Sequence, residues 1–329
     1  MKVAIIGAGI CGLYLGWKLA EKGHQVTVFE KKEKIGKEAC SGLFSERILE
    51  FIPESRKLIQ NQINSVLIHW VAGGWRPKCT LKINFSRKFF AMSHFELDNL
   101  VAELAENSGA KIILNHPVSS LPKEFERIIG CDGANSWVRK SLGLKEPQFR
   151  LGIQGFLSQS NNSNFVETWQ VNQGFIWKIP RGIEIEYGII SDSKEAKLLF
   201  DNFLEKNNLQ LPECQRRVKM NEVHRLERIN SGVIPQGLII PSNQKITLCG
   251  DAVGLTKPWS GGGVVWSLIA ANILLKNFPD FLKYQKEMKK FFLPKIIFSK
   301  IATKIIYFLG YNFPWILPKD YKIEGDFLL

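Results

Sequence analysis

The sequence predicts a protein that combines α/β structure around a parallel sheet with an antiparallel β-sheet and a helical C-terminal tail. Three observations lead to this prediction: a strand, glycine-rich turn and helix within residues 3–22, a run of strands over 150–190, and a tail rich in Lys and aromatic residues from 276 onward. The chain has 329 residues, 45% of them hydrophobic, so it can bury a large core. About two domains are expected, and a small disulfide-stapled module or a disordered regulator is excluded.

The predicted elements begin with a βαβ unit made of a strand at 3–7, a helix at 11–22 and a strand at 25–30. A second helix starts at Phe95 and ends at Gly109. Further strands are expected at 65–71, 79–85, 127–131, 150–157, 164–171, 174–180, 183–190 and 245–252. The return of strand–turn–helix patterns late in the chain predicts domains that interleave.

The expected domain boundaries follow from this order. The nucleotide-binding domain is assigned to residues 1–64, 90–145 and 241–275, the antiparallel substrate-binding domain to 65–89 and 146–240, and a basic helical tail to 276–329. The tail is expected to form amphipathic helices broken at Pro294.

The net charge and the spacing of the cysteines limit the classes of function that the protein can have. Lys and Arg number 44 against 31 for Asp and Glu, a net charge of +13 that favours phosphates on a cofactor, a nucleic acid or an anionic membrane. The six cysteines form no CxxC pair, so neither a structural metal nor a disulfide framework is expected. The sequence has no zinc finger, RNP-like segment or basic recognition helix, which excludes nucleic acid as the main partner.

The uncharged run between Lys257 and Lys276 approaches the length of a membrane span. It opens with three glycines, Gly261 to Gly263, and therefore favours a loop followed by a buried helix. We expect no transmembrane segment and a cytoplasmic location.

A dinucleotide motif opens the chain at Gly7-x-Gly9-x-x-Gly12, between a strand and a helix. Gly7 permits a tight turn, Gly9 lets the backbone approach a pyrophosphate, and Gly12 allows close packing of helix and strand. Glu30 ends the next strand and can accept hydrogen bonds from a ribose. The motif alone does not separate NAD from FAD.

Two later segments favour FAD over NAD. GCDGANSWVR at 130–139, and CGDA at 249–252 with its three following glycines, resemble the second and third FAD motifs of the para-hydroxybenzoate hydroxylase-like flavoproteins. The resemblance implies that FAD is the cofactor and that Asp251 bonds its ribityl chain. The helix after the glycines would point its positive end at the flavin ring. At the position of the usual phosphate-binding Arg stands His94, either a weaker phosphate partner or only a helix-start residue.

Two segments resemble the geranylgeranyl reductase family. In KEACSGLF at 37–44, the Cys-Ser-Gly element is similar to the one that lies at the flavin face in that family, so Cys40 is a candidate proton donor or, alternatively, a packing residue. FIWKIP at 175–180, followed by Gly188, is similar to the family's signature for the substrate cavity. Alternation would place Phe175, Trp177 and Ile179 on one apolar face, or in an ordinary sheet core.

The motifs together define the expected site. The cofactor-binding candidates are Gly7, Gly9, Gly12, Glu30, Lys31, Ala39, Cys40, Gly42, His94, Val118, Asp132, Asp251, Gly262, Gly263 and Val264. The substrate candidates are Phe175, Trp177, Pro180 and Trp259, and no metal ligand is expected.

The resemblance implies an FAD-dependent reductase of prenyl C=C bonds, acting on a prenyl lipid or prenyl diphosphate. A flavin-dependent monooxygenase or halogenase is the alternative, because Trp177-x-Ile179-Pro180 also resembles a halogenase signature. A flavin- or lipid-binding protein without turnover is a third hypothesis.

No second dinucleotide motif is visible, so the electron donor, NADPH or a ferredoxin-like protein, is expected to bind transiently. The Lys-rich tail is expected to bind an anionic membrane surface, which would make the protein peripheral on the inner face of the membrane, or to cap the substrate channel.

Overall fold

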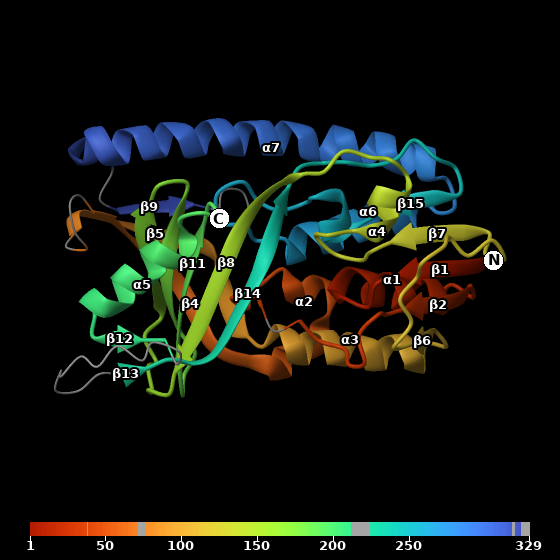
Figure 1. Cartoon of the computed structure of the whole chain (residues 1–329), viewed down its shortest axis with the longest axis horizontal. Coiled ribbons are helices and arrows are strands. Elements are labelled where there is room, and N and C mark those ends of the chain that lie inside the picture. The colour runs from red at the N-terminus through yellow and green to blue at the C-terminus, as the bar shows by residue number, and fades with distance from the viewer. Residues whose placement is uncertain (38, 72–74, 76, 212–223, 318–319, 324–329) are drawn as a thin grey trace.

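The computed structural model describes residues 1–37, 39–71, 75, 77–211, 224–317 and 320–323. The chain forms two adjoining β-sheet regions, and the longest helix runs along both of them (Figure 1). This arrangement confirms the predicted fold class, with a parallel sheet, a second sheet and a helical C-terminal region.

The first region is a five-stranded sheet in which every pair of neighbours is parallel. Its strands, in spatial order, are β15 (Ile246–Leu248), β7 (Arg127–Gly130), β1 (Lys2–Ile6), β2 (Gln25–Phe29) and β6 (Lys111–Ile113). The strands come from three separate stretches of chain, so this sheet is interleaved with the second one. The loop after β1 lies at the carboxyl edge of the sheet, where parallel α/β folds bind their ligands.

Helices pack against this sheet through apolar side chains. The core includes the buried faces of α1 (Ile10–Glu21), α3 (His94–Asn107) and α6 (Val264–Asn277). The Ser93 hydroxyl caps α3 by accepting from Glu96 N. The uncharged run predicted as loop and buried helix does form α6, and no described helix is long and apolar enough to cross a membrane.

The second region is a nine-stranded sheet with several short satellites. Its strands are β14 (Glu227–Gln236), β8 (Gln148–Leu157), β11 (Ile185–Ser191), β10 (Gly174–Pro180), β9 (Phe165–Val171), β4 (Ile59–Val71), β5 (Pro77–Met92), β16 (Asp320–Ile323) and, beside β5, β3 (Leu43–Ser45). The satellites of this sheet are α5 (Ala196–Lys206), β12 (Leu209–Gln210) and β13 (His224–Arg225). The short helices α2 (Ile48–Phe51) and α4 (Trp137–Ser141) pack instead in the core of the parallel-sheet region.

The second sheet is mixed rather than antiparallel throughout. β4 runs parallel to β9, and β16 parallel to β5, while the other pairs are antiparallel. The alternation pattern within one strand reports which face is buried but not the direction of its neighbour. β4 and β5 are also longer than the 65–71 and 79–85 predicted for them.

The tail forms one continuous helix, α7 (Phe281–Asn312), that contains Pro294. The expectation of a break at Pro294 is therefore wrong. Pro294 lies on the exposed side of α7, whereas Phe292 and Ile296 on either side of it are buried in the core of the parallel-sheet region. Burial of these side chains holds the axis in place, although proline removes one backbone hydrogen bond.

The packing of α7 gives a test with a matched control. Phe292 is fully buried against Trp266, at 5.4 Å between ring centroids, whereas the adjacent Phe291 is 38% exposed. Phe292→Ala should lower the free energy of unfolding by about 3–5 kcal/mol, because it leaves a cavity. Phe291→Ala should change it by about 1 kcal/mol or less. Urea unfolding monitored by circular dichroism measures both, and equal losses would show that α7 is not seated on its Phe292 face.

Candidate active site

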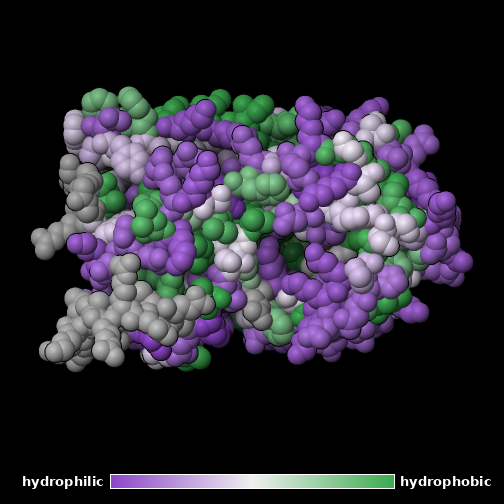
Figure 2. Space-filling view, viewed as in Figure 1, coloured by the Kyte–Doolittle hydropathy of each residue, from purple (hydrophilic) through white to green (hydrophobic). Residues whose placement is uncertain are grey.

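One cavity of about 1280 Å³ extends between the two sheets. Most of the predicted site residues line it: Gly7, Gly9, Glu30, Lys31, Ala39, Cys40, His94, Val118, Asp132, Phe175, Trp177, Asp251, Trp259, Gly262, Gly263 and Val264. Figure 2 shows the surface hollowed between the two regions, with hydrophobic residues inside the hollow. The cavity therefore joins the dinucleotide motif to the predicted apolar wall.

Three predicted residues do not line this cavity. Gly12 packs against the loop before it, since a Cβ there would lie 2.0 Å from Gly7 O. Gly42, with φ +58°, approaches Met92 O in the same way rather than a ligand. Pro180 ends β10, where its carbonyl accepts a hydrogen bond from Asn61.

The dinucleotide loop has the shape its motif predicts. Gly7 has a φ of +105°, and a Cβ there would lie 2.4 Å from Cys131 O, so the turn requires glycine. A Cβ at Gly9 would meet nothing within 4 Å, so the side of Gly9 that faces the cavity is open. Gly9 is also the N-cap of α1 and has no side chain to cap it. The uncapped N–H groups of α1 and the open backbone fit a pyrophosphate.

Carboxylates stand at both sides of this loop. The Glu30 carboxylate accepts hydrogen bonds from Ala8 N at 2.7 Å and Lys32 N at 3.0 Å, which fixes it beside the loop for a ribose. Asp132 accepts from Val138 N through Oδ2, while its buried Oδ1 lacks a partner within the described chain. An orphaned buried oxygen that lines the cavity fits a hydrogen-bond donor on a bound cofactor.

Asp251 contacts the segment that follows β2. Lys37 Nζ lies 3.2 Å from Asp251 Oδ2, and the charge of Asp251 raises the pKa of Lys37. The backbone N–H of Lys37 donates to Asp98 on α3. The Lys37 segment is therefore anchored to two elements that are distant from it in the chain.

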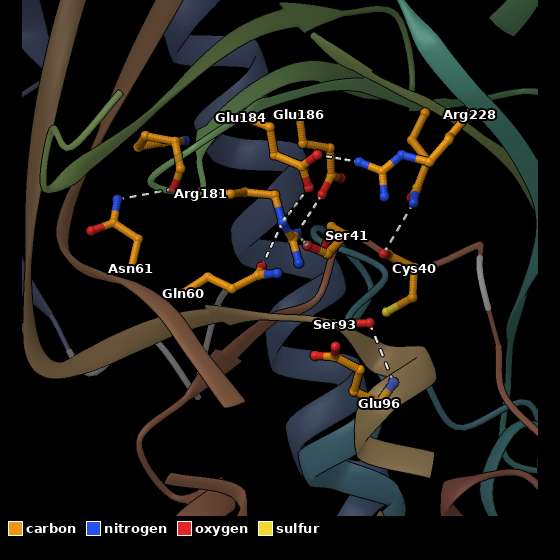
Figure 3. A network of polar contacts seen from close by, with 12 residues as sticks. Cys40, Ser41, Gln60, Asn61, Ser93, Glu96, Arg181, Glu184, Glu186 and Arg228 are labelled. Carbon is orange, nitrogen blue, oxygen red and sulfur yellow. Dashed lines mark hydrogen bonds and ion pairs between the residues drawn. The ribbon is translucent and has the colours of Figure 1, made fainter. Parts of the chain in front are cut away.

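Cys40, His94 and Asp98 all line the cavity and form a cluster of titratable groups. His94 Nε2 lies 3.3 Å from Asp98 Oδ1, and both side chains are almost completely buried. Neither ring nitrogen of His94 has a hydrogen bond of regular geometry in the described chain. In Figure 3 the Cys40 sulfur points toward the start of α3, where Ser93 precedes His94.

Electrostatics within this cluster stabilise the charged forms of Cys40 and His94. Burial raises the pKa of the Cys40 thiol, but the charges of His94 and Lys37 outweigh it and lower the pKa to about 7. Burial lowers the pKa of His94, but the charges of Asp98 and Cys40 raise it to about 10. The imidazolium is thus stabilised beside a thiol that loses its proton near neutral pH.

A buried ion pair holds the Cys40 loop against the second sheet (Figure 3). Arg181 Nη1 donates to Glu186 Oε2 at 2.6 Å and to Ser41 O at 2.7 Å, and Arg181 Nε donates to Gln60. Gln154 Nε2 donates to Cys40 O at 3.1 Å. Burial raises the pKa of Glu186, although Arg181 and Trp177 oppose the rise.

The far end of the cavity is an apolar wall. Phe175 and Trp259 stack with centroids 4.8 Å apart and an interplanar angle of 29°. Trp177 is held by its indole N–H, which donates to Glu186 Oε1 at 2.8 Å. A Cβ at Gly188 would lie 2.2 Å from the Trp177 ring, so glycine there makes room for the indole. These rings and their aliphatic neighbours can enclose a hydrocarbon chain.

Sequence reasoning missed four residues that shape the site. Arg181 and Glu186 carry the buried ion pair, Gln154 binds the Cys40 carbonyl, and Asp98 pairs with His94. Two signals were available: the spacing from His94 to Asp98 is one helical turn, and Glu186 interrupts the apolar strand IEYGIIS. No local pattern indicates the contact of Arg181 with Ser41.

Comparisons with known proteins agree with this architecture. A family model described as "NAD(P)-binding Rossmann-like domain" matches residues 5–47. A digeranylgeranylglycerophospholipid reductase of Methanosarcina mazei is 22% identical over 311 residues, which cover 82% of this chain and 73% of that protein.

Solved structures share the fold at low identity. A geranylgeranyl bacteriochlorophyll reductase-like protein from Thermoplasma acidophilum superposes with a TM-score of 0.73 at 19% identity, covering 88% of this chain and 83% of that one. The chain resembles geranylgeranyl reductases in sequence and in fold. A flavin-dependent brominase superposes with a TM-score of 0.72 at 14% identity, covering 96% of this chain and 89% of that one.

These findings confirm the resemblance and the Rossmann-type dinucleotide site that the motifs predict, and they support FAD as the cofactor. The brominase superposes almost as well as the reductase-like protein. Fold likeness therefore does not choose between reductase and halogenase chemistry.

The two glycines of the loop give a matched test of cofactor binding. Gly9→Val should reduce the flavin that copurifies with the protein by about tenfold or more, because its side chain would occupy the open space beside the loop. Its thermal midpoint without flavin should stay near that of the wild type. Gly12→Ala should lower the midpoint itself, because its Cβ meets Gly7 O.

Flavin absorbance per mole of protein and calorimetry of the flavin-free forms measure these two effects separately. Normal flavin content in Gly9→Val would show that the cofactor phosphates do not bind beside Gly9.

Proposed function

We propose that this protein is an FAD-dependent reductase that saturates carbon–carbon double bonds of prenyl chains in lipids or diphosphates. The observation that carries the proposal is that one cavity is lined by the dinucleotide loop, by an aromatic, apolar wall and by Cys40. The resemblance to digeranylgeranylglycerophospholipid reductases supports the substrate class.

Different groups of the proposed site residues bind different parts of FAD. Gly7, Gly9 and the N-terminus of α1 bind the pyrophosphate, Glu30 the ribose, and Asp132 and Asp251 the polar chain beyond it. Gly262, Gly263 and Val264 line the cavity at the start of α6, and the positive end of this helix would stabilise negative charge on a reduced flavin. Bound and reduced, FAD supplies a hydride.

Cys40 is the proposed proton donor, and His94 and Lys37 stabilise the thiolate that proton transfer leaves behind. An isolated alkene is a weak electrophile, so a proton must reach one carbon as the hydride reaches the other. Phe175, Trp177 and Trp259 hold the chain and exclude water from this end of the cavity. The electron donor, NADPH or a ferredoxin-like protein, binds transiently.

A flavin-dependent monooxygenase or halogenase is the second candidate, favoured by the similarity to the brominase fold and by Trp177-x-Ile179-Pro180. Such an enzyme requires oxygen, whereas the proposed reductase does not. A half-buried thiol that lines the cavity can donate a proton to carbon, and this favours the reductase.

Oxygen dependence separates the two activities. The flavin-loaded protein, reduced chemically under anaerobic conditions, should convert a geranylgeranyl lipid to a product heavier by two hydrogens per bond reduced, as measured by mass spectrometry. Geranylgeranyl diphosphate and a fully saturated chain serve as alternative substrate and negative control. Product that forms only when oxygen is admitted would overturn the reductase proposal, and flavin that no prenyl substrate reoxidises would favour a binding protein.

The proposed proton donor can be tested through its pH profile. Cys40→Ala should lower kcat by about 10²-fold or more with flavin content unchanged, because the proton transfer is lost. Cys79→Ala, a half-buried thiol on β5, serves as the control. Wild-type kcat should fall as the pH rises through about 7, where the Cys40 thiol loses its proton.

Replacement of His94 tests the partner of that thiol. His94→Gln removes the charge that lowers the Cys40 pKa, so the fall in kcat should move to higher pH. A pH profile that is identical in wild type and His94→Gln would exclude the thiol–imidazolium pair as the titrating group.

A further inference from the structure

The outward side of the tail is unusually apolar for a helix in contact with water. Of the eighteen large hydrophobic side chains exposed in the described chain, eleven lie between Phe291 and Ile316. Ile301, Ile305 and Phe308 follow one another at helical spacing on α7 and are 53%, 52% and 60% exposed. In Figure 2 hydrophobic residues form a strip along the edge of the molecule occupied by α7 in Figure 1.

The inward side of α7 is already occupied. Phe292 and Ile296 pack in the core of the parallel-sheet region, and Tyr307 packs in the core of the second sheet. The Tyr307 hydroxyl donates to Gly174 O at 2.6 Å. Gly310 lies so close to Trp70 that a Cβ would be 2.3 Å from the indole. The helix therefore cannot turn its exposed apolar side chains inward without breaking these contacts.

The strip continues beyond the helix. Phe313, Trp315 and Ile316 follow α7 in a short 3₁₀ turn, and Trp315 is 73% exposed. We call Phe298, Ile301, Ile305, Phe308, Trp315 and Ile316 the outer α7 face. Aromatic residues at the end of an amphipathic helix are typical of structures that lie at a lipid–water interface.

Charge indicates the kind of partner. α7 carries seven Lys against one Glu, and Lys300 and Lys304 are exposed within the same stretch as the apolar strip. A second copy of this chain, docked face to face by two-fold symmetry, would bring two such rows of lysines together. An anionic lipid surface instead offers phosphates to the lysines and hydrocarbon to the apolar side chains.

We propose that the outer α7 face docks on the surface of an anionic phospholipid bilayer, with α7 lying along the membrane plane. None of the described helices could span the bilayer, so the attachment is peripheral and reversible. This inference concerns where the protein works and does not depend on the reaction it catalyses.

The experiment uses the full-length, flavin-loaded protein and vesicles of phosphatidylglycerol or phosphatidylcholine. Wild type should sediment with phosphatidylglycerol vesicles at least about tenfold more strongly than with phosphatidylcholine, and the difference should shrink at high salt. Ile301→Gln, Ile305→Gln and Phe308→Gln combined should weaken binding at least about tenfold, since these side chains no longer enter the hydrocarbon. Lys300→Gln with Lys304→Gln should weaken binding to the anionic vesicles only.

A matched control replaces exposed apolar residues elsewhere. Ile183→Gln with Leu198→Gln removes side chains that are 82% and 64% exposed but lie outside α7, and vesicle binding should be unchanged. Thermal midpoints and turnover of a detergent-dispersed substrate should be close to wild type in all variants, which separates this test from that of the proposed reaction.

Three results would overturn the proposal. They are absence of binding to anionic vesicles, unchanged binding in the triple variant, and equal binding to both lipids. A wild-type dimer that the triple variant converts to monomer, without vesicle binding by either, would identify the outer α7 face as a self-association surface instead.

Discussion

The site depends on one buried ion pair, between Arg181 and Glu186, that joins the loop after β2 to the second sheet. Both charges lie out of water, and the remaining donors of Arg181 bind Ser41 O and Gln60. Removing one member of a buried pair typically costs about 3–5 kcal/mol, because the other charge is left without a partner. The pair is weak evidence for stability. It does fix the position of the loop, since Arg181 binds Glu186, Ser41 O and Gln60 at the same time.

The position so fixed is that of the Cys40 thiol. Gln154 holds the carbonyl of Cys40 from the second sheet, while Lys37, three residues earlier, reaches Asp98 and Asp251 in the first region. Glu186 also accepts from Trp177, so the same carboxylate orients the aromatic wall and the arginine that anchors the thiol loop. The positions of the Cys40 loop and of the aromatic wall are thereby coupled through one hydrogen-bond network.

The features that could be predicted from the sequence are those that depend on residues close to one another in the chain. Gly7, Gly9 and Gly12 lie close to one another in the chain. Their spacing alone therefore predicts the strand–turn–helix unit. The Arg181–Ser41 bond joins residues 140 positions apart and depends on how β10 lies against the loop, which no local pattern records. The same limit explains Pro294: the break expected from proline alone is overridden by Phe292 and Ile296, whose burial is a tertiary property.

In the tail, the sequence pattern predicts a helix correctly but does not predict how that helix is oriented on the protein. Lys interleaved with apolar residues predicts an amphipathic helix, but the sequence alone does not say which apolar side chains meet the protein. Contacts with Trp70 decide this. Tyr307 packs edge-on against the indole, and a Cβ at Gly310 would lie 2.3 Å from it. Ile301, Ile305 and Phe308 remain more than half exposed. The contacts that seat α7 over the second sheet thus also determine which of its apolar side chains remain for a partner. Under the proposed function, a substrate anchored in the bilayer would reach an enzyme held at the same surface.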